Sequence, residues 1–362
     1  MNKYKVCVYA ICKNESKFIE RWVKSMREAD EIYVFDTGSD DGSVELLQKL
    51  GVNVKSEVIK PWRFDVARNK SLDMVPLDTD ICVCTDIDEV FEAGWREKLE
   101  AIWNENVCKV KYNYHWSFDE NGNPATTFYI EKIHRRDGYK WVHPVHEVLN
   151  VIDGEVSVLA PNITLNHYPD AEKSRSSYLP LLELSVKEEP EDDRNMHYLG
   201  REYMYYGKYN EAIDTLIRHL SLPRATWDAE RCASMRFIAR CYMSLNRPKE
   251  AEMWLQDAIK EASYLRESYV ELAQLYVNQN RYNEAYELLN KAFLIKEKAP
   301  IYINEAFAWN EYIYELMGIV CFNLKLYPES LSYMGEALKL NEKSERIKNN
   351  YDFINKTING DI

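Results

Sequence analysis

The second half of this 362-residue chain repeats a helical pattern, and this repetition constrains the fold more than any other feature. From about residue 193 onward, nearly every stretch carries apolar residues at helical spacing. Four times, a small residue is followed by another small residue 12 positions later: Gly200 and Ala212, Ala239 and Ala251, Ala273 and Ala285, and Gly318 and Ser330. Small residues are needed where two helices of one unit cross closely, so the sequence predicts stacked helix pairs.

These units resemble the tetratricopeptide repeat, a helix–turn–helix motif of about 34 residues. The step from the second unit to the third matches that length, but the last step is longer, and we interpret residues 296–306, which include Pro300, as an insertion. His219 stands where the pattern prefers a small residue, so the first repeat is expected to be atypical. We place about four repeats at 192–345 and a C-terminal helix or tail at 346–362. A generic helical bundle is the alternative.

The first half instead alternates short, β-rich apolar runs with amphipathic helical segments. Strands are predicted over residues 4–11, 31–35, 52–58 and 80–85, with helices over 15–27, 43–50 and 65–74 between them. This order indicates a parallel sheet with helices on its faces. Further strands are predicted over residues 107–118, 126–133, 142–151 and 157–166. We place this α/β domain at residues 1–169, followed at 170–191 by a charged helical connector that is broken by Pro180 and Pro190.

Four polar segments lie at or near the ends of these parallel strands, where open α/β sheets bind ligands. They occupy residues 10–16 (AICKNES), 36–43 (DTGSDDGS), 64–69 (FDVARN) and 86–89 (DIDE). Each has a simpler interpretation when taken alone, since Asn14 or Ser16 would suit a helix cap and a lone Asp-x-Asp is a weak signal. The sequence contains no glycine-rich dinucleotide or P-loop motif, which argues against those classes of enzyme.

Taken together and in this order, the motifs resemble the family-2 glycosyltransferases of the GT-A fold over roughly residues 4–168. The resemblance implies an α/β GT-A nucleotide-diphospho-sugar transferase domain, followed here by an all-α tetratricopeptide-repeat domain. In that family the Asp-x-Asp binds Mn²⁺ or Mg²⁺, because carboxylates hold a diphosphate only through a cation. Asp86 and Asp88 are therefore the expected metal ligands, and His146 or His143 is expected to be a third ligand or a phosphate contact.

The resemblance also implies a donor site. Asp36 is expected to accept hydrogen bonds from the base or ribose, in a pocket lined by Asn14, Glu15 and Thr37. Arg68 is expected to contact the diphosphate or orient the carboxylates, and a structural pair with an aspartate is an equally open alternative. Trp141 is expected to stack on a sugar face. The residues expected to contact the donor are Ala10, Cys12, Asn14, Glu15, Asp36, Thr37, Asp65, Arg68, Asp86, Ile87 and Trp141.

Five of the seven histidines lie between residues 115 and 167, close to the pair His146-Glu147. In the family such a pair often faces the donor sugar, so Glu147 is predicted to be the general base that deprotonates the acceptor. Glu89 and Asp65 are other carboxylates near the expected site. The implied reaction is a single displacement that inverts the anomeric carbon.

The composition limits the classes of ligand and the cellular compartment that we expect for this protein. A net charge of −13 argues against general binding to nucleic acids or anionic membranes. We expect neither a signal peptide nor a membrane span, because the N-terminal apolar stretch is short and no apolar window is long enough. The eight cysteines form no Cys-x-x-Cys pair, and we expect them to be reduced thiols of a cytoplasmic protein.

Joined to such a transferase, the repeats suggest recruitment of an acceptor peptide or protein, as in the bacterial peptide and protein glycosyltransferases that this architecture resembles. The donor is expected to be a UDP-hexose or a UDP-N-acetylhexosamine. One alternative is the same chemistry on a saccharide or lipid-linked glycan. The repeats would otherwise form a homodimer interface or brace the catalytic domain. The remaining alternative is a tetratricopeptide adaptor without catalytic activity.

Overall fold

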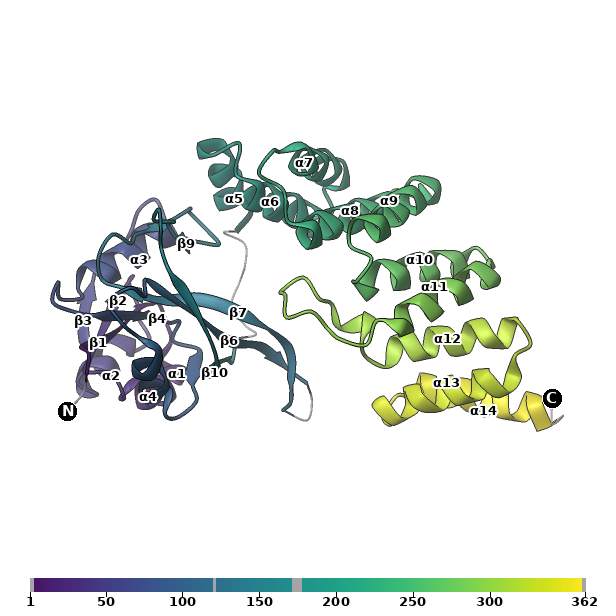
Figure 1. Cartoon of the computed structure of the whole chain (residues 1–362), viewed down its shortest axis with the longest axis horizontal. Helices are drawn as coiled ribbons and strands as arrows, with labels where there is room; N and C mark the ends of the chain where they lie inside the picture. Colours follow the sequence, from purple (N-terminus) through teal and green to yellow (C-terminus); the bar gives the residue numbers. More distant parts are fainter. Residues whose placement is uncertain (1–2, 120–121, 171–177, 360–362) are drawn as a thin grey trace. The chain divides into compact units, whose positions relative to one another are not determined.

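The computed structural model describes residues 3–119, 122–170 and 178–359, and the chain divides into two units (Figure 1). The first unit comprises Met1–Glu188 together with Pro300–Tyr302, and the second comprises Glu189–Ala299 and Ile303–Ile362. The connector predicted at 170–191 is therefore divided between them. Its helix α5 (Tyr178–Glu188) groups with the first unit, and residues 171–177 lie outside the described part of the chain.

An eight-stranded sheet forms the centre of the first unit. Its strand order is β3 (Asn53–Ser56), β2 (Glu31–Asp36), β1 (Val6–Cys12), β4 (Ile81–Cys84), β7 (Pro124–Arg135), β6 (Lys109–Phe118), β10 (Ser157–His167) and β5 (Glu89–Phe91). Strands β1 to β4 are mutually parallel, as the alternation of strands and helices predicts. Strand β7 runs antiparallel to both β4 and β6 and begins the mixed half of the sheet. Two short strands, β8 (Trp141–Val142) and β9 (Val148–Leu149), pair separately.

Side chains of β1 alternate between two apolar cores, one on each face of the sheet. Val6, Val8 and Ala10 belong to the larger core, which is completed by α1 (Ser16–Met26), α2 (Ser43–Lys49) and α4 (Trp95–Ile102). Cys7 and Tyr9 belong to the other core, together with residues of α3 (Phe64–Asp73) and the β8–β9 pair. Because β1, β2 and β4 are parallel, the loops that follow them emerge at one edge of the sheet.

The second unit consists of successive antiparallel helix pairs. Its helices are α6 (Asp193–Tyr205), α7 (Tyr209–Ser221), α8 (Asp228–Ser244), α9 (Pro248–Glu261), α10 (Arg266–Asn278), α11 (Tyr282–Leu294), the 3-10 turn η1 (Ala306–Ala308), α12 (Glu311–Asn323), α13 (Tyr327–Leu340) and α14 (Glu345–Asn359). The paired small residues lie where consecutive helices meet, and a Cβ at Gly200 would lie only 2.5 Å from Leu216 Cγ. The expected insertion forms the connection between α11 and α12. The expected atypical position, His219, is buried and hydrogen-bonded to Ser234 Oγ at 2.9 Å.

The prediction that Pro180 breaks the connector helix is wrong. Within the described residues, α5 continues through Pro180 to Glu188. The predicted break at Pro190 agrees with the structure, because α5 ends at Glu188 and α6 begins at Asp193. All eight cysteines are free and buried. Within the described ranges, no helix combines the length and apolar character that a membrane span requires.

Candidate active site

The loops after β1 and β2 are tied to each other by hydrogen bonds. Asn14 donates its backbone N–H to Ser39 Oγ at 2.8 Å, and its side-chain Oδ1 accepts from the Asp40 N–H at 2.9 Å. Thr37 donates both its N–H and its hydroxyl to the carbonyl of Cys12, at 2.9 and 3.0 Å. Asn14 and Thr37 therefore fix the shape of this edge of the sheet, and their contact with a nucleoside stays a prediction.

Asp36, at the end of β2, is buried and organises the turn that follows it. Its carboxylate accepts hydrogen bonds from the backbone N–H groups of Gly38 and Ser39, at 3.0 and 3.2 Å, and from the Ser39 hydroxyl. Gly38 has a φ of 106°, which explains why glycine occupies this turn. The geometry positions Asp36 beside the loop of Asn14, as the sequence predicts, but most of its acceptor capacity serves the turn itself.

Several residues expected to contact the donor have buried side chains. Ala10, Cys12 and Ile87 belong to the main apolar core, so any contact of theirs with a ligand would come from the backbone. Glu15 is buried as well, and its N–H donates to Ser43 Oγ at 2.9 Å. Asp65, in the first turn of α3, forms a two-pronged ion pair with the guanidinium of Arg63, at 3.0 and 2.8 Å.

Trp141 does not occupy the position that a sugar platform requires. It is only 4% exposed, and its indole N–H donates to the hydroxyl of Tyr9 at 2.8 Å. The Tyr9 hydroxyl in turn contacts His134 Nε2 at 2.7 Å, and burial lowers the pKa of His134 to about 3. Since this ring is enclosed in the core, we correct the expectation that it stacks on a sugar. It lies instead against Arg68, whose Cζ is 5.4 Å from the ring centre.

Arg68 joins the two carboxylates that the sequence places in catalytic roles. Its Nη2 lies 2.6 Å from Asp86 Oδ1, and its Nε lies 2.9 Å from Glu147 Oε1. Burial lowers the pKa of Arg68, but the two carboxylates outweigh burial and hold it well above its usual value. The structure therefore pairs Arg68 with carboxylates, which agrees both with an orienting role and with a structural pair, and its contact with a diphosphate stays a prediction.

A second cation, Lys132 of β7, also contacts Asp86 and was not predicted from the sequence. Its Nζ lies 3.0 Å from Asp86 Oδ2 and 3.0 Å from Glu89 Oε1. Burial raises the pKa of Asp86, yet Arg68 and Lys132 together lower it below its ordinary value. A single lysine in a strand carries no motif, so only the pairing of β7 with β4 reveals its role.

Glu89 anchors the turn of the Asp-x-Asp. It is fully buried, and its carboxylate accepts hydrogen bonds from the Tyr114 hydroxyl at 2.7 Å and from the Asp86 N–H at 2.8 Å. Burial raises the pKa of Glu89, and Lys132 opposes that effect. A carboxylate so enclosed is poorly placed to meet an acceptor, which leaves Glu147 as the better candidate for the base.

Asp88 faces a histidine from the mixed half of the sheet. Its Oδ2 lies 3.5 Å from His167 Nε2, at the end of β10. His167 Nδ1 lies 3.0 Å from the Trp116 carbonyl, which can only accept, so Nδ1 carries a proton and Nε2 is the ring nitrogen that faces Asp88. Burial lowers the pKa of His167, and Asp88 more than offsets this, so the pKa is raised. The ring of His146, in contrast, lies against Tyr178, with ring centres 5.7 Å apart.

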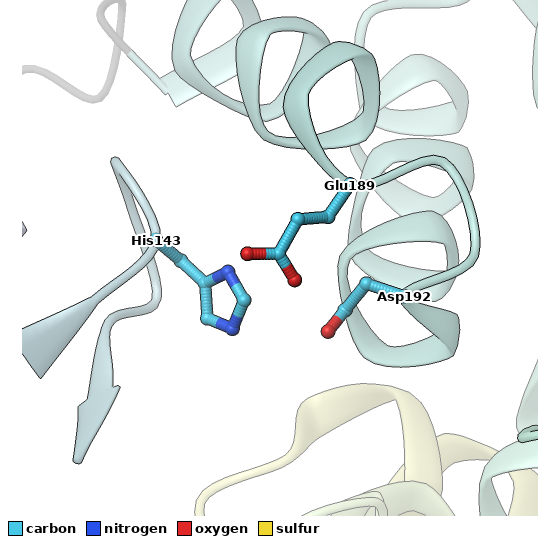
Figure 2. Close-up of side chains that lie close together, drawn as sticks. All are labelled: His143, Glu189 and Asp192. Atoms are coloured by element: carbon cyan, nitrogen blue, oxygen red, sulfur yellow. The ribbon is translucent and has the colours of Figure 1, made fainter. Parts of the chain in front are cut away.

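Figure 2 shows another group of potential metal ligands, His143, Glu189 and Asp192. Asp192 is the N-cap of α6, and its carboxylate accepts from the Asn195 N–H at 2.7 Å. This capping bond accounts for the aspartate without a metal. His143 belongs to the first unit and the two acidic residues to the second, so we assign no site to the three.

A parallel strand followed by an Asp-x-Asp, together with a unit of helical repeats, agrees with the class of nucleotide-sugar transferase domains joined to repeats. The family model named Glycosyl transferase family 2 matches residues 7–146, and the tetratricopeptide repeat model matches residues 267–298. The chain therefore carries a family-2 glycosyltransferase domain of the GT-A fold, followed by tetratricopeptide repeats.

The curated relatives are similar over part of their length. An uncharacterized glycosyltransferase of Rickettsia bellii (strain RML369-C) is 33% identical over 100 residues, which cover 27% of this chain and 33% of that protein. One of Rickettsia conorii (strain ATCC VR-613 / Malish 7) is 31% identical over 100 residues and is covered to 34%. The chain thus matches about a third of the length of these relatives.

Two solved structures illustrate the similarity of the chain to known folds. A crystal structure of MamA is 21% identical with a TM-score of 0.38, and the match covers 49% of this chain and 97% of that one. A thermophilic TPR protein in Thermus thermophilus is 16% identical with a TM-score of 0.36, and the match covers 49% of this chain and 89% of that one.

Proposed function

We propose that this protein is a cytoplasmic, inverting, metal-dependent glycosyltransferase that moves a hexose or N-acetylhexosamine from a UDP-sugar to a side chain of a peptide or protein. The observation that carries the proposal is the guanidinium of Arg68, which joins Asp86 of the Asp-x-Asp to Glu147. This guanidinium places Asp86, which is expected to face the donor, close to Glu147, the expected base, although the two residues are 61 positions apart in the sequence.

The residues around Asp88 fit a divalent cation. A carboxylate oxygen and an imidazole nitrogen lie 3.5 Å apart, and these are ligand types that Mn²⁺ accepts once the ring has released its proton. We therefore assign the histidine ligand to His167 in place of His146. When bound, the cation would neutralise the donor diphosphate and stabilise the leaving group. Asp86 already pairs with two protein cations, so Asp88 is the more available aspartate.

The remaining steps fall to side chains of the cluster. Arg68 holds Glu147 through Oε1, and we assign the other oxygen, Oε2, to take the proton of the acceptor as the new bond forms. Arg68 and Lys132 place positive charge beside the diphosphate, where negative charge grows during departure. The deprotonated acceptor attacks the anomeric carbon from the face opposite the leaving diphosphate, and this displacement inverts the configuration of that carbon.

The repeat unit offers a surface for the acceptor. Within it, α8, α9, α10, η1 and α12 line a cavity of about 520 Å³. Its lining combines apolar side chains such as Phe307 with the amides of Gln274 and Asn278, which hydrogen-bond to each other at 2.8 Å. Amides of this kind can exchange their mutual bond for bonds to a peptide backbone, and repeat arrays hold extended peptides in such hollows. A saccharide or lipid-linked acceptor remains the alternative, as does a dimer interface.

The first test is isothermal titration of UDP, GDP and dTDP into the full-length protein, with Mn²⁺ and with EDTA. We expect micromolar binding of UDP that requires both the metal and Asp88, so that Asp88→Ala abolishes it. Asp78→Ala is the matched control, because Asp78 is an exposed aspartate of the same unit that pairs with Lys5. Absence of metal-dependent binding for all three nucleotides would favour the adaptor alternative. A separate experiment, a peptide pulldown on residues 192–345, distinguishes a peptide acceptor from a saccharide acceptor.

A further inference from the structure

An exposed tryptophan, Trp116, lies next to the proposed metal-binding residues. The sequence alone predicts Trp141 as the tryptophan that contacts the sugar. Trp116, near the end of β6, is 47% exposed, whereas Trp141 is enclosed in the core. One face of Trp116 stacks on the ring of His167, with centres 4.5 Å apart and planes 24° apart. Because that face is covered by the imidazole, the exposed half of the side chain belongs to the remainder of the indole.

A short chain of contacts links this ring to the Asp-x-Asp. Trp116 supports His167 twice, through the stacked ring and through its backbone carbonyl, which His167 Nδ1 contacts at 3.0 Å. His167 Nε2 then faces Asp88 at 3.5 Å. The indole is therefore in contact with the imidazole whose Nε2 faces Asp88.

We infer that the exposed face of Trp116 is the platform on which the sugar ring of the donor stacks. The inference rests on the proposed function, because the sugar of a nucleotide-sugar is bonded directly to the diphosphate that Asp88 would hold. A diphosphate held at Asp88 would place its sugar close to His167, and Trp116 stacks on the ring of that histidine. The neighbouring aromatic residue is less suited, since Tyr168 lies against Phe118 at 5.2 Å and under the guanidinium of Arg21 at 4.9 Å.

The chemistry of the two surfaces is complementary. The face of an indole ring carries negative charge density, and its edge carries positive charge. One face of a pyranose presents C–H groups that neighbouring hydroxyls polarise, so it is both apolar and slightly positive. Stacking of these faces buries apolar area and leaves the hydroxyls of the sugar at the rim, where they remain available to polar groups. A broad, rigid ring suits this task because it loses little side-chain entropy on binding.

The test compares a nucleotide with its sugar conjugate on the same variants. Isothermal titration measures the affinities of UDP, UDP-glucose and UDP-N-acetylglucosamine in Mn²⁺ for the wild type, Trp116→Ala and Trp116→Phe. We expect Trp116→Ala to weaken both conjugates about tenfold while the affinity for UDP changes less than about twofold, which corresponds to the stacking of one aromatic ring. Trp116→Phe keeps a ring and should retain most of the affinity for the conjugates.

Trp227→Ala provides the matched control, because Trp227 is a comparably exposed tryptophan of the repeat unit, and it should change none of these affinities. An equal loss of UDP and its conjugates in Trp116→Ala would show that the ring only supports His167, and would overturn the platform. Unchanged affinities for all three ligands would overturn it as well. If the wild type fails to bind UDP in the presence of Mn²⁺, the proposed function itself falls, and the platform falls with it.

Discussion

Removal of the Lys132 ammonium tests the buried charge cluster most directly. Lys132→Met keeps the length of the side chain but deletes the charge that lies 3.0 Å from both Asp86 and Glu89. Asp86 is 34% exposed and keeps its pair with Arg68, so it tolerates the loss. Glu89 is fully buried, and it would retain only hydrogen bonds from Tyr114 and from the backbone of Asp86. The cost of the substitution therefore falls mainly on Glu89.

The loss of stability in Lys132→Met has an upper limit, because Glu89 can take up a proton. Breaking a buried ion pair by removing one partner costs about 3 to 5 kcal/mol. A glutamate can limit this cost by taking up a proton, and at pH 7 protonation from an unfolded-state pKa of about 4.3 costs about 3.7 kcal/mol. We expect Lys132→Met to lower the free energy of unfolding at pH 7 by about 2 to 3.7 kcal/mol on this reasoning.

The same reasoning fixes the sign of the pH dependence. Burial raises the pKa of Glu89, and the loss of Lys132 removes the charge that opposes this effect. The folded variant then holds a proton that the unfolded chain releases above its own pKa, so the stability of the variant falls as pH rises from about 4.3 toward neutrality. Lowering the pH from 7 to 5 should reduce the difference from the wild type to about 1 kcal/mol.

Urea unfolding followed by tryptophan fluorescence at pH 5, 6 and 7 measures this difference. Lys70→Met is the matched control, since Lys70 contacts Glu57 at 2.7 Å but both side chains are well exposed, and we expect a cost below about 1 kcal/mol. Adding Glu89→Gln to Lys132→Met should recover most of the lost stability. A cost no larger than that of Lys70→Met, or one that does not shrink between pH 7 and pH 5, would refute the reasoning.

Three further predictions concern the base, the metal ligand and the repeats. Glu147→Gln should reduce the turnover number of transfer at least about 100-fold while the calorimetric affinity for UDP changes little, and retained turnover would rule out this base. His167→Ala should weaken Mn²⁺-dependent UDP binding about tenfold or more and His146→Ala should not, whereas the reverse pattern would restore the original assignment. Gly200→Ala should destabilise the repeat unit by about 1 to 3 kcal/mol in thermal unfolding, because its Cβ would overlap the adjacent helix. Gly335→Ala, at a helical site with ordinary contact distances, should be neutral or stabilising by about 0.5 to 1 kcal/mol, and equal effects would contradict the close crossing.

Local sequence patterns were sufficient to predict the division into a sheet domain and helical repeats. The periodicity of side chains and the spacing of small residues depend on neighbours within one element or one helix pair, and these neighbours are close in the sequence. The position of Asp86 just after β4 and that of Arg68 in a helix followed from the same local patterns. The prediction of a break at Pro180 failed, because α5 continues through this proline.

What the sequence determined by itself was therefore the order of the elements, the small-residue crossings of the repeats and the edge of the sheet at which the polar loops gather. Only the tertiary structure decided that Lys132 pairs with Asp86, that His167 and not His146 faces Asp88, and that Trp116 is exposed while Trp141 is enclosed. These contacts join residues 46 or more positions apart, through a mixed sheet in which β7 and β10 lie beside strands that the sequence does not indicate. The burial of a side chain also depends on distant residues, because a tryptophan is enclosed or exposed according to which distant elements pack over it.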